Sequence, residues 1–282
     1  MRMPRNYYYL VAGLPDIVLD NTKKGLPLAS VLDEILEQTA PSDRALFTLL
    51  FYQYDNNNLI TILENTGGEF DTRGNFSQEE LAQEIKIPSI LPGYMQQFVE
   101  SYKEGKLPFP ELSLSDQLSW CYYDFITAHE NDFIREWMTF DLNLRNVLAG
   151  LNSRKLEESG WAGATQFSRE RSIICRNEVA ELILKSTAPD FSLASRFAWV
   201  EKLLSFNRET VVEYEKNIDL LRWEMLDALT TFSCFQIETL LAFYIKLGMV
   251  ERWQELAPET GKAALDKLLA EFSTGYTIME KS

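Results

Sequence analysis

The sequence predicts an all-α protein. After residue 28, apolar residues recur at intervals of three and four, which is the spacing of one buried helix face. Alternation with a period of two is confined to short stretches such as residues 7–12. The chain has 282 residues, of which 46% are hydrophobic and 24% are charged. This composition is ordinary for a globular protein, and a chain of this length buries a substantial core without disulfides.

Three short helices are expected in the first quarter of the chain: residues 28–39, 43–54 and 59–64. Pro41 cannot continue the first of them, and Ser42 is well suited to cap the second. The Asn56–Asn58 tract is expected to separate the second helix from the third. Ser77 and Glu80 form a capping-box pattern, which predicts another helix start.

Two connectors are expected to divide the chain. The first runs from Gly105 to Ser115 and contains two prolines, and the second is Ala188-Pro189-Asp190. Between them, two helices are expected over residues 116–155, with a break near Asn131. We therefore predict three similar helical subdomains: residues 1–110, 111–189 and 190–282.

The longest periodic signal lies in the third of these subdomains. Apolar residues step by three and four from Val211 to Phe235, which predicts one long helix or two in tandem. Such a stripe is typical of the inner face of a bundle helix, and a partner-binding coiled coil is the alternative. Pro258 marks the start of a last helix over residues 259–272.

A six-residue pattern occurs twice in the chain. Asn58–Leu63 and Asn143–Leu148 each follow an aromatic residue and an aspartate, and their first residues lie 143 − 58 = 85 positions apart. One helical module used twice would explain this spacing, and two unrelated amphipathic helices that share a leucine pattern are the alternative. The repeat predicts two pairs of matching core residues: Leu59 with Leu144, and Ile62 with Val147.

The charge of the chain bears on its partners. A net charge of −15 repels phosphate backbones and anionic membrane surfaces, so we expect neither nucleic acid nor direct membrane insertion. Basic protein partners fit this charge, as does a simple role in solubility. The longest uncharged apolar-rich stretch, Ala228–Ile237, is far shorter than the roughly 18 residues of a membrane span. The opening segment Tyr7–Gly13 is expected to be buried rather than to act as a signal peptide.

Few residues offer catalytic or metal-binding chemistry. The three cysteines, Cys121, Cys175 and Cys234, are widely spaced, which favours a reducing compartment and neither a disulfide framework nor a zinc site. The only histidine, His129, has no accompanying nucleophile motif, and no phosphate-binding glycine loop is present. We therefore predict no catalytic residue, cofactor site or metal site.

Three groups of acidic residues offer alternatives to this view. Asp16 and Asp20 lie four apart, so on a helix they would share a face and could bind Mg²⁺. Asp55–Leu59 resembles the start of a calcium loop, but Ile60 stands where that loop needs glycine. Gly67–Asp71 resembles the signature of cyclic-dinucleotide synthases, which belong to an α/β fold. We expect all three to be loop or surface segments.

Three segments resemble the C subunit of the archaeal and bacterial V-type ATPase, whose eukaryotic counterpart is the d subunit. The opening Asn6–Pro15 is similar to an uncharacterised bacterial family associated with V-type ATPase operons. Phe140–Leu148 resembles the Asp-x-x-Asn-Leu helix that occurs once in each helical domain of the C subunit, and Glu238–Leu247 resembles the helix before its third such motif. Val250–Leu256 departs from that third motif, because its asparagine and arginine are missing.

The resemblance implies a funnel of three similar helical domains that is seated on the membrane rotor ring and receives the foot of the central stalk. It implies a non-catalytic coupling protein of a V-type ATPase or ATP synthase, without a cofactor, cytoplasmic and peripherally membrane-associated through the complex. An acidic funnel would suit a basic stalk foot. A helical adaptor of an unrelated complex is the alternative function. A magnesium-dependent all-α enzyme that uses Asp16 and Asp20 is a more distant one.

Overall fold

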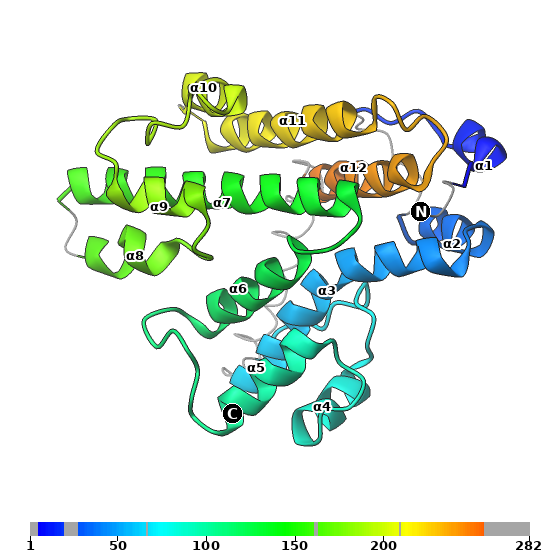
Figure 1. Cartoon of the computed structure of the whole chain (residues 1–282), viewed down its shortest axis with the longest axis horizontal. Coiled ribbons are helices and arrows are strands. Elements are labelled where there is room, and N and C mark those ends of the chain that lie inside the picture. Colours follow the sequence, from blue (N-terminus) through cyan, green and yellow to red (C-terminus); the bar gives the residue numbers. More distant parts are fainter. Residues whose placement is uncertain (1–4, 20–27, 66, 161–162, 209, 257–282) are drawn as a thin grey trace, which may run out of the picture. The chain divides into compact units, whose positions relative to one another are not determined.

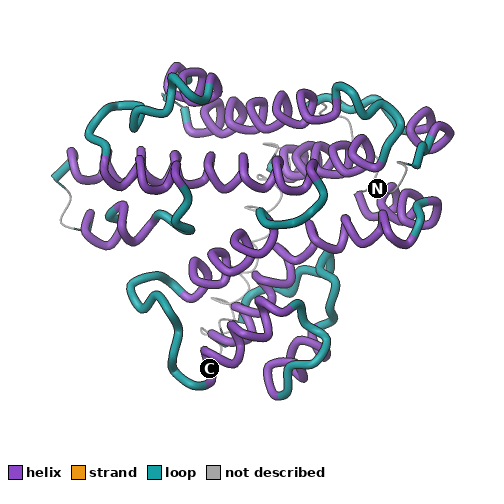
Figure 2. Tube along the Cα trace, viewed as in Figure 1, coloured by secondary structure: helices purple, strands orange, loops and turns teal. Residues whose placement is uncertain are grey.

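The computed structural model describes residues 5–19, 28–65, 67–160, 163–208 and 210–256. These residues form twelve α-helices and one short 3-10 helix, and no strand occurs among them (Figure 2). The all-α prediction is therefore confirmed. The chain divides into two compact units, one of residues 1–43 with 226–282 and the other of residues 44–225. The division into three similar subdomains and the funnel stay predictions.

In chain order (Figure 1) the helices are α1 (Tyr8–Gly13), α2 (Leu28–Gln38), α3 (Pro41–Glu64), α4 (Gln78–Lys86), α5 (Gly93–Lys103), α6 (Leu114–Ile126), α7 (Asp132–Glu158), η1 (Ala164–Phe167), α8 (Arg169–Ser172), α9 (Glu178–Lys185), α10 (Ala198–Ser205), α11 (Val211–Thr230) and α12 (Ile237–Glu255). In the first unit, α2 packs against α12. In the second unit, α5 packs against α6, α6 against α7, and α7 against η1, α8 and α9.

Helix α3 runs without interruption through the three asparagines at which the sequence predicts a break, so that prediction is wrong. Asparagine side chains disfavour a helix because they compete for its backbone hydrogen bonds. Here two of them bond elsewhere. Asn56 Oδ1 accepts a hydrogen bond from the Tyr94 hydroxyl (2.9 Å), and Asn58 bonds the backbone of Asp71. Pro41 is the first residue of this helix, where its missing N–H costs nothing.

Two helix starts that the sequence predicts are confirmed. The Ser77 hydroxyl accepts a hydrogen bond from the Glu80 backbone N–H, and the Glu80 carboxylate accepts one from the Ser77 N–H (2.8 Å), which completes the capping box of α4. Asn131 Oδ1 accepts from the Ile134 N–H (2.9 Å) and begins α7, next to the predicted break.

The periodic stretch from Val211 to Phe235 forms α11 followed by a loop, and α12 begins at Ile237. Ile218 and Leu221 in the middle of α11 are buried, as an inner face requires. The ends of the stretch are not, because Val211 is 77% exposed and Phe232 is 95% exposed. The apolar stripe therefore overestimates the buried face. The last predicted helix, residues 259–272, lies outside the described residues.

Helix α7 packs very closely against the chain that follows it (Figure 1). A Cβ atom on Gly150 would lie 2.5 Å from Cγ2 of Ile183 on α9 and 3.1 Å from Cζ of Phe191. Both neighbours are fully buried, so neither has solvent to move into. We expect Gly150→Ala to lower the free energy of unfolding by about 1–3 kcal/mol, because overpacking exceeds the gain in helix propensity.

The matched control for this substitution is Gly248→Ala on α12, where a Cβ atom would have no neighbour within 4 Å. This change should leave the free energy of unfolding unchanged or raise it by up to about 1 kcal/mol. Urea unfolding of both variants measures the difference. Equal effects of the two substitutions would contradict the close packing of α7 on α9.

Candidate functional site

A buried carboxylate and a buried amide on α3 hold a distant loop. Asp55 Oδ1 accepts a hydrogen bond from the Phe76 N–H (3.1 Å), and its Oδ2 accepts one from Asn75 Nδ2 (2.7 Å). One turn later, Asn58 pairs with the backbone of Asp71: Nδ2 donates to the carbonyl (2.8 Å), and Oδ1 accepts from the N–H (2.8 Å). We call Asp55 and Asn58 the α3 clamp. It fixes the loop of residues 71–76 just before α4 begins.

The loop approaches the α3 clamp closely at Gly74. A Cβ atom on Gly74 would lie only 2.4 Å from Oδ1 of Asp55, so a larger residue would push the loop away. Burial raises the pKa of the Asp55 carboxyl, and hydrogen bonds from Asn75 and Phe76 oppose this shift without cancelling it. Asp55 therefore serves as an acceptor in a site that disfavours its charge.

Helix α7 also holds a distant loop through two side chains. Asn143 Oδ1 accepts a hydrogen bond from Asn177 Nδ2 (2.9 Å). One turn later, Asn146 pairs with the backbone of Ile174: Nδ2 donates to the carbonyl (2.7 Å), and Oδ1 accepts from the N–H (3.1 Å). Asn177 then caps α9 by accepting from the Ala180 N–H (2.9 Å). We call Asn143 and Asn146 the α7 clamp.

The two clamps share one plan: a long helix presents two Asx side chains one turn apart, and these hold the loop that leads into the next capped helix. By hydrogen-bonding role, Asn58 corresponds to Asn146, and 146 − 58 = 88. The spacing by hydrogen-bonding role therefore differs by three residues, nearly one helical turn, from the spacing of 85 in the sequence pattern. The expected core pairs fit only partly: Leu59, Leu144 and Val147 are buried, whereas Ile62 is half-buried.

A polar network connects α6, α7 and α11 within the second unit. The Tyr123 hydroxyl donates to Asp141 Oδ2 (2.5 Å), and Arg222 lies 3.6 Å from Asp141 Oδ1 and 3.0 Å from Asp219 Oδ1. Burial raises the pKa of Tyr123, and Asp141 adds to this shift. Burial acts to lower the pKa of Arg222, but the two carboxylates outweigh it, so the pKa lies above its ordinary value. The network holds Arg222 charged between two acids.

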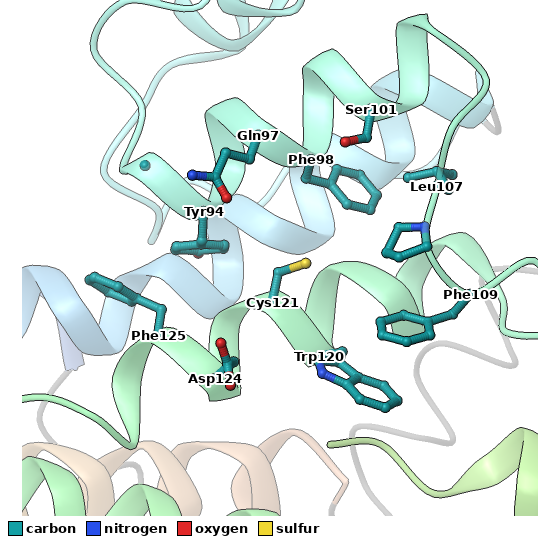
Figure 3. Close-up of a pocket in the computed structure, with 12 residues that line it drawn as sticks. Tyr94, Gln97, Phe98, Ser101, Leu107, Phe109, Trp120, Cys121, Asp124 and Phe125 are labelled. Carbon is teal, nitrogen blue, oxygen red and sulfur yellow. The ribbon is translucent and has the colours of Figure 1, made fainter. Parts of the chain in front are cut away.

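A cleft of about 500 Å³ opens between α5, α6 and the connector that joins them (Figure 3). Two pairs of stacked rings line it. Phe109 and Trp120 have ring centroids 3.9 Å apart with 19° between their planes, and Tyr94 and Phe125 are 5.2 Å apart with 28° between their planes. Phe98 of α5 also projects into this space. We call this space the aromatic cleft.

The polar groups of the aromatic cleft come from both helices: Gln97 and Ser101 from α5, and Cys121 and Asp124 from α6. Asp124 is exposed, and it supplies the one charged side chain among the twelve lining residues. The Cys121 thiol points into the space between the rings (Figure 3). Burial raises the pKa of this thiol, and the charge of Asp124 raises it further. The thiol is therefore held protonated, which makes it a poor nucleophile.

The opening segment, which carries the most specific resemblance, is anchored in the first unit. The Tyr7 hydroxyl hydrogen-bonds the Asp43 carboxylate, and the Tyr7 N–H donates to the carbonyl of Phe235 (2.6 Å). A second cavity, of about 230 Å³, lies between this segment and α2. The prediction that residues 7–13 are buried is wrong, because only Leu10 is buried and Tyr9 is 94% exposed. The segment therefore offers aromatic surface to solvent.

Two of the three acidic segments that the sequence offers as alternative sites lie side by side, because Asn58 of one bonds the backbone of Asp71 of the other. Asp16 is exposed in a loop after α1, which removes the helical face that a magnesium pair needs, and Asp20 lies outside the described residues. Asp55 is fully buried within α3 rather than at the surface, so that expectation is wrong. Gly67–Asp71 is a loop, as expected. His129 Nδ1 accepts from the backbone N–H of the residue that caps α7, which is a structural role.

The described part of the chain offers little for metal chemistry. Within these residues, no three histidine, cysteine or acidic side chains gather as a metal ion would require. All three cysteines are free: Cys121 is half-buried, Cys175 is buried and Cys234 is exposed. Within the same ranges, no helix has the length and apolar character needed to cross a bilayer.

Comparison with known proteins assigns a family. A model described as "Protein of unknown function (DUF2764)" matches residues 3–275, nearly the whole chain, and the chain belongs to this family. No curated protein and no solved structure matches it.

Proposed function

We propose that this member of the DUF2764 family is a non-catalytic component of a V-type ATPase or ATP synthase, where it links the central rotor stalk to the membrane ring. The observation that carries the proposal is the pair of clamps. Both clamps lie within the helices that carry the repeated sequence pattern, α3 and α7. The α7 clamp lies in Phe140–Leu148, which resembles the motif of the V-type ATPase C subunit. Repeated helical modules are what that resemblance implies.

The clamps suit a protein that transmits torque. A coupling protein transmits torque through shape and packing, so the loops that connect its helices need to be rigid. Asn58 and Asn146 each tie a loop to a long helix through two hydrogen bonds to one backbone residue. Such bonds restrain the loop in position and direction, which supports a role in force transmission.

The charge of the chain suits a basic partner. A net charge of −15 attracts a basic stalk over a distance set by the Debye length, about 8 Å at physiological salt. In this proposal the protein is cytoplasmic and reaches the membrane only through the rotor ring of the complex. It carries no cofactor and performs no catalysis of its own.

We expect affinity capture of the full chain from native membranes to recover the catalytic and central-stalk subunits of a rotary ATPase. Recovery of other soluble partners alone would overturn the proposal and favour the alternative, a helical adaptor of an unrelated complex. With an isolated stalk, the association rate should fall markedly as salt rises from about 50 to 500 mM, because screening shortens electrostatic steering. An association rate that does not change with salt would rule out electrostatic docking. The result of the affinity capture would still stand.

A further inference from the structure

We propose that the aromatic cleft binds a lysine or arginine side chain of the partner protein. This inference rests on the proposed function, in which the basic partner is the central stalk. Three properties of the cleft carry it: its size, the rings of its walls and the charge at its mouth.

The size and walls fit one long side chain with its backbone neighbours. A volume of about 500 Å³ lies in the range typical of ligand pockets. Aromatic faces attract ammonium and guanidinium groups, and the apolar stem of lysine or arginine packs well against rings. The guanidinium carbon of Arg176 lies 6.0 Å from the centroid of the Trp120 ring, at the outer limit of a cation–π contact.

The charge at the mouth selects a cation. No lysine, arginine or histidine is among the twelve residues that line the cleft, and Asp124 is the only acid. Among the described residues no ion pair engages Asp124, whereas Asp116 on the same helix pairs with Arg145 at 2.7 Å. A cationic side chain would gain both the unpaired carboxylate and the rings. An anionic ligand would meet repulsion from Asp124 and from the net charge of −15.

The first test uses N-acetyl-arginine amide as the probe and N-acetyl-citrulline amide, which has the same shape without the charge, as its control. Binding is read from the indole N–H resonance of Trp120, which the Trp120→Phe variant identifies. We expect the arginine probe to shift this resonance in a saturable manner and the citrulline probe to leave it in place. Equal shifts from both probes, or no shift up to about 50 mM arginine probe, would overturn the proposal.

The matched variants each remove one negative charge from the second unit. Asp124→Asn changes the cleft, and Glu157→Gln changes an exposed acid at the end of α7. We expect Asp124→Asn to weaken binding of the arginine probe about threefold to fivefold, as for an exposed ion pair, and Glu157→Gln to change it less than about twofold. Equal effects would show that only the overall charge matters, which contradicts a built site.

Titration of the isolated central stalk with three proteins separates this inference from the proposed function. These are the wild-type protein, Asp124→Asn and Glu157→Gln. Weaker stalk binding by Asp124→Asn alone supports the cleft as the docking point. Equal stalk binding by all three overturns the cleft as that point and leaves the coupling role standing. If the stalk binds none of them, the coupling role and the identity of the partner both fail. The arginine and citrulline probes then decide by themselves whether the cleft binds a cation.

Discussion

Replacing Asn146 by alanine is expected to lower the free energy of unfolding by about 3–5 kcal/mol. The Asn146 side chain is the hydrogen-bond partner of both the N–H and the carbonyl of Ile174, and both residues are fully buried. Alanine would leave these two backbone groups without partners in a place that water does not reach. Each such group costs about 1–3 kcal/mol, and the small cavity adds to that cost. Urea unfolding followed by circular dichroism measures the change.

The same helix provides the control. Asn152 is exposed, and we expect Asn152→Ala to change the free energy of unfolding by less than about 0.5 kcal/mol. Asn58→Ala, in the other clamp, should cost about 1–2 kcal/mol, because Asp71 is only partly buried and water can replace the lost bonds. If Asn146→Ala cost no more than Asn152→Ala, the α7 clamp would not hold the loop.

The helices could be predicted from sequence where their information is local. The spacing of apolar residues, the capping box at Ser77 and the cap at Asn131 all act within one or two turns, and the structure confirms them. The break expected in α3 does not occur, because the groups that satisfy its asparagines are distant in the sequence. Tyr94 and Asp71 satisfy the asparagines of that helix from 38 and 13 residues away. A prediction made from the residues of one helix cannot include these partners.

The candidate sites show the same limit. Residue identity in the repeated pattern aligns Asn58 with Asn143. By hydrogen-bonding role, however, Asn58 corresponds to Asn146. The pattern of two Asx residues three apart, Asp55-x-x-Asn58 and Asn143-x-x-Asn146, gives the correct register. The aromatic cleft has no such signal. Its rings come from two helices and a connector, and only packing brings them together.

A second large effect is expected at the junction of α4 and α5. Glu84 is buried, and its Oε2 accepts hydrogen bonds from the backbone N–H groups of Ser89 (2.6 Å), Ile90 (2.9 Å) and Leu91 (3.3 Å). Its Oε1 accepts one from the Ser89 hydroxyl (2.7 Å). Glu84→Ala removes every one of these acceptors, so we expect it to lower the free energy of unfolding by about 3–5 kcal/mol. Gln83→Ala, at an exposed position of the same helix, should have an effect below about 0.5 kcal/mol.

Glu84→Gln separates the shape of this side chain from its charge. Glutamine keeps one oxygen for the backbone donors and turns its amide toward the Ser89 hydroxyl, which can accept, so we expect a cost of only about 1–2 kcal/mol. Burial is the largest influence on the pKa of Glu84 and acts to raise it. The hydrogen bonds from Ser89, Ile90 and Leu91 together outweigh burial, so the pKa lies below its ordinary value of 4.5.

The sign of the pH dependence follows from this shift. Because the folded pKa lies below the unfolded pKa, the charged carboxylate stabilises the fold in full above about pH 4.5, and this contribution is lost as the pH falls through the folded pKa. Between about pH 6 and 3, the free energy of unfolding should therefore fall more steeply for the wild-type protein than for Glu84→Gln. Urea unfolding across this range measures both slopes. Parallel curves would mean that the Glu84 charge does not stabilise the turn between α4 and α5, and that the hydrogen bonds act through geometry alone.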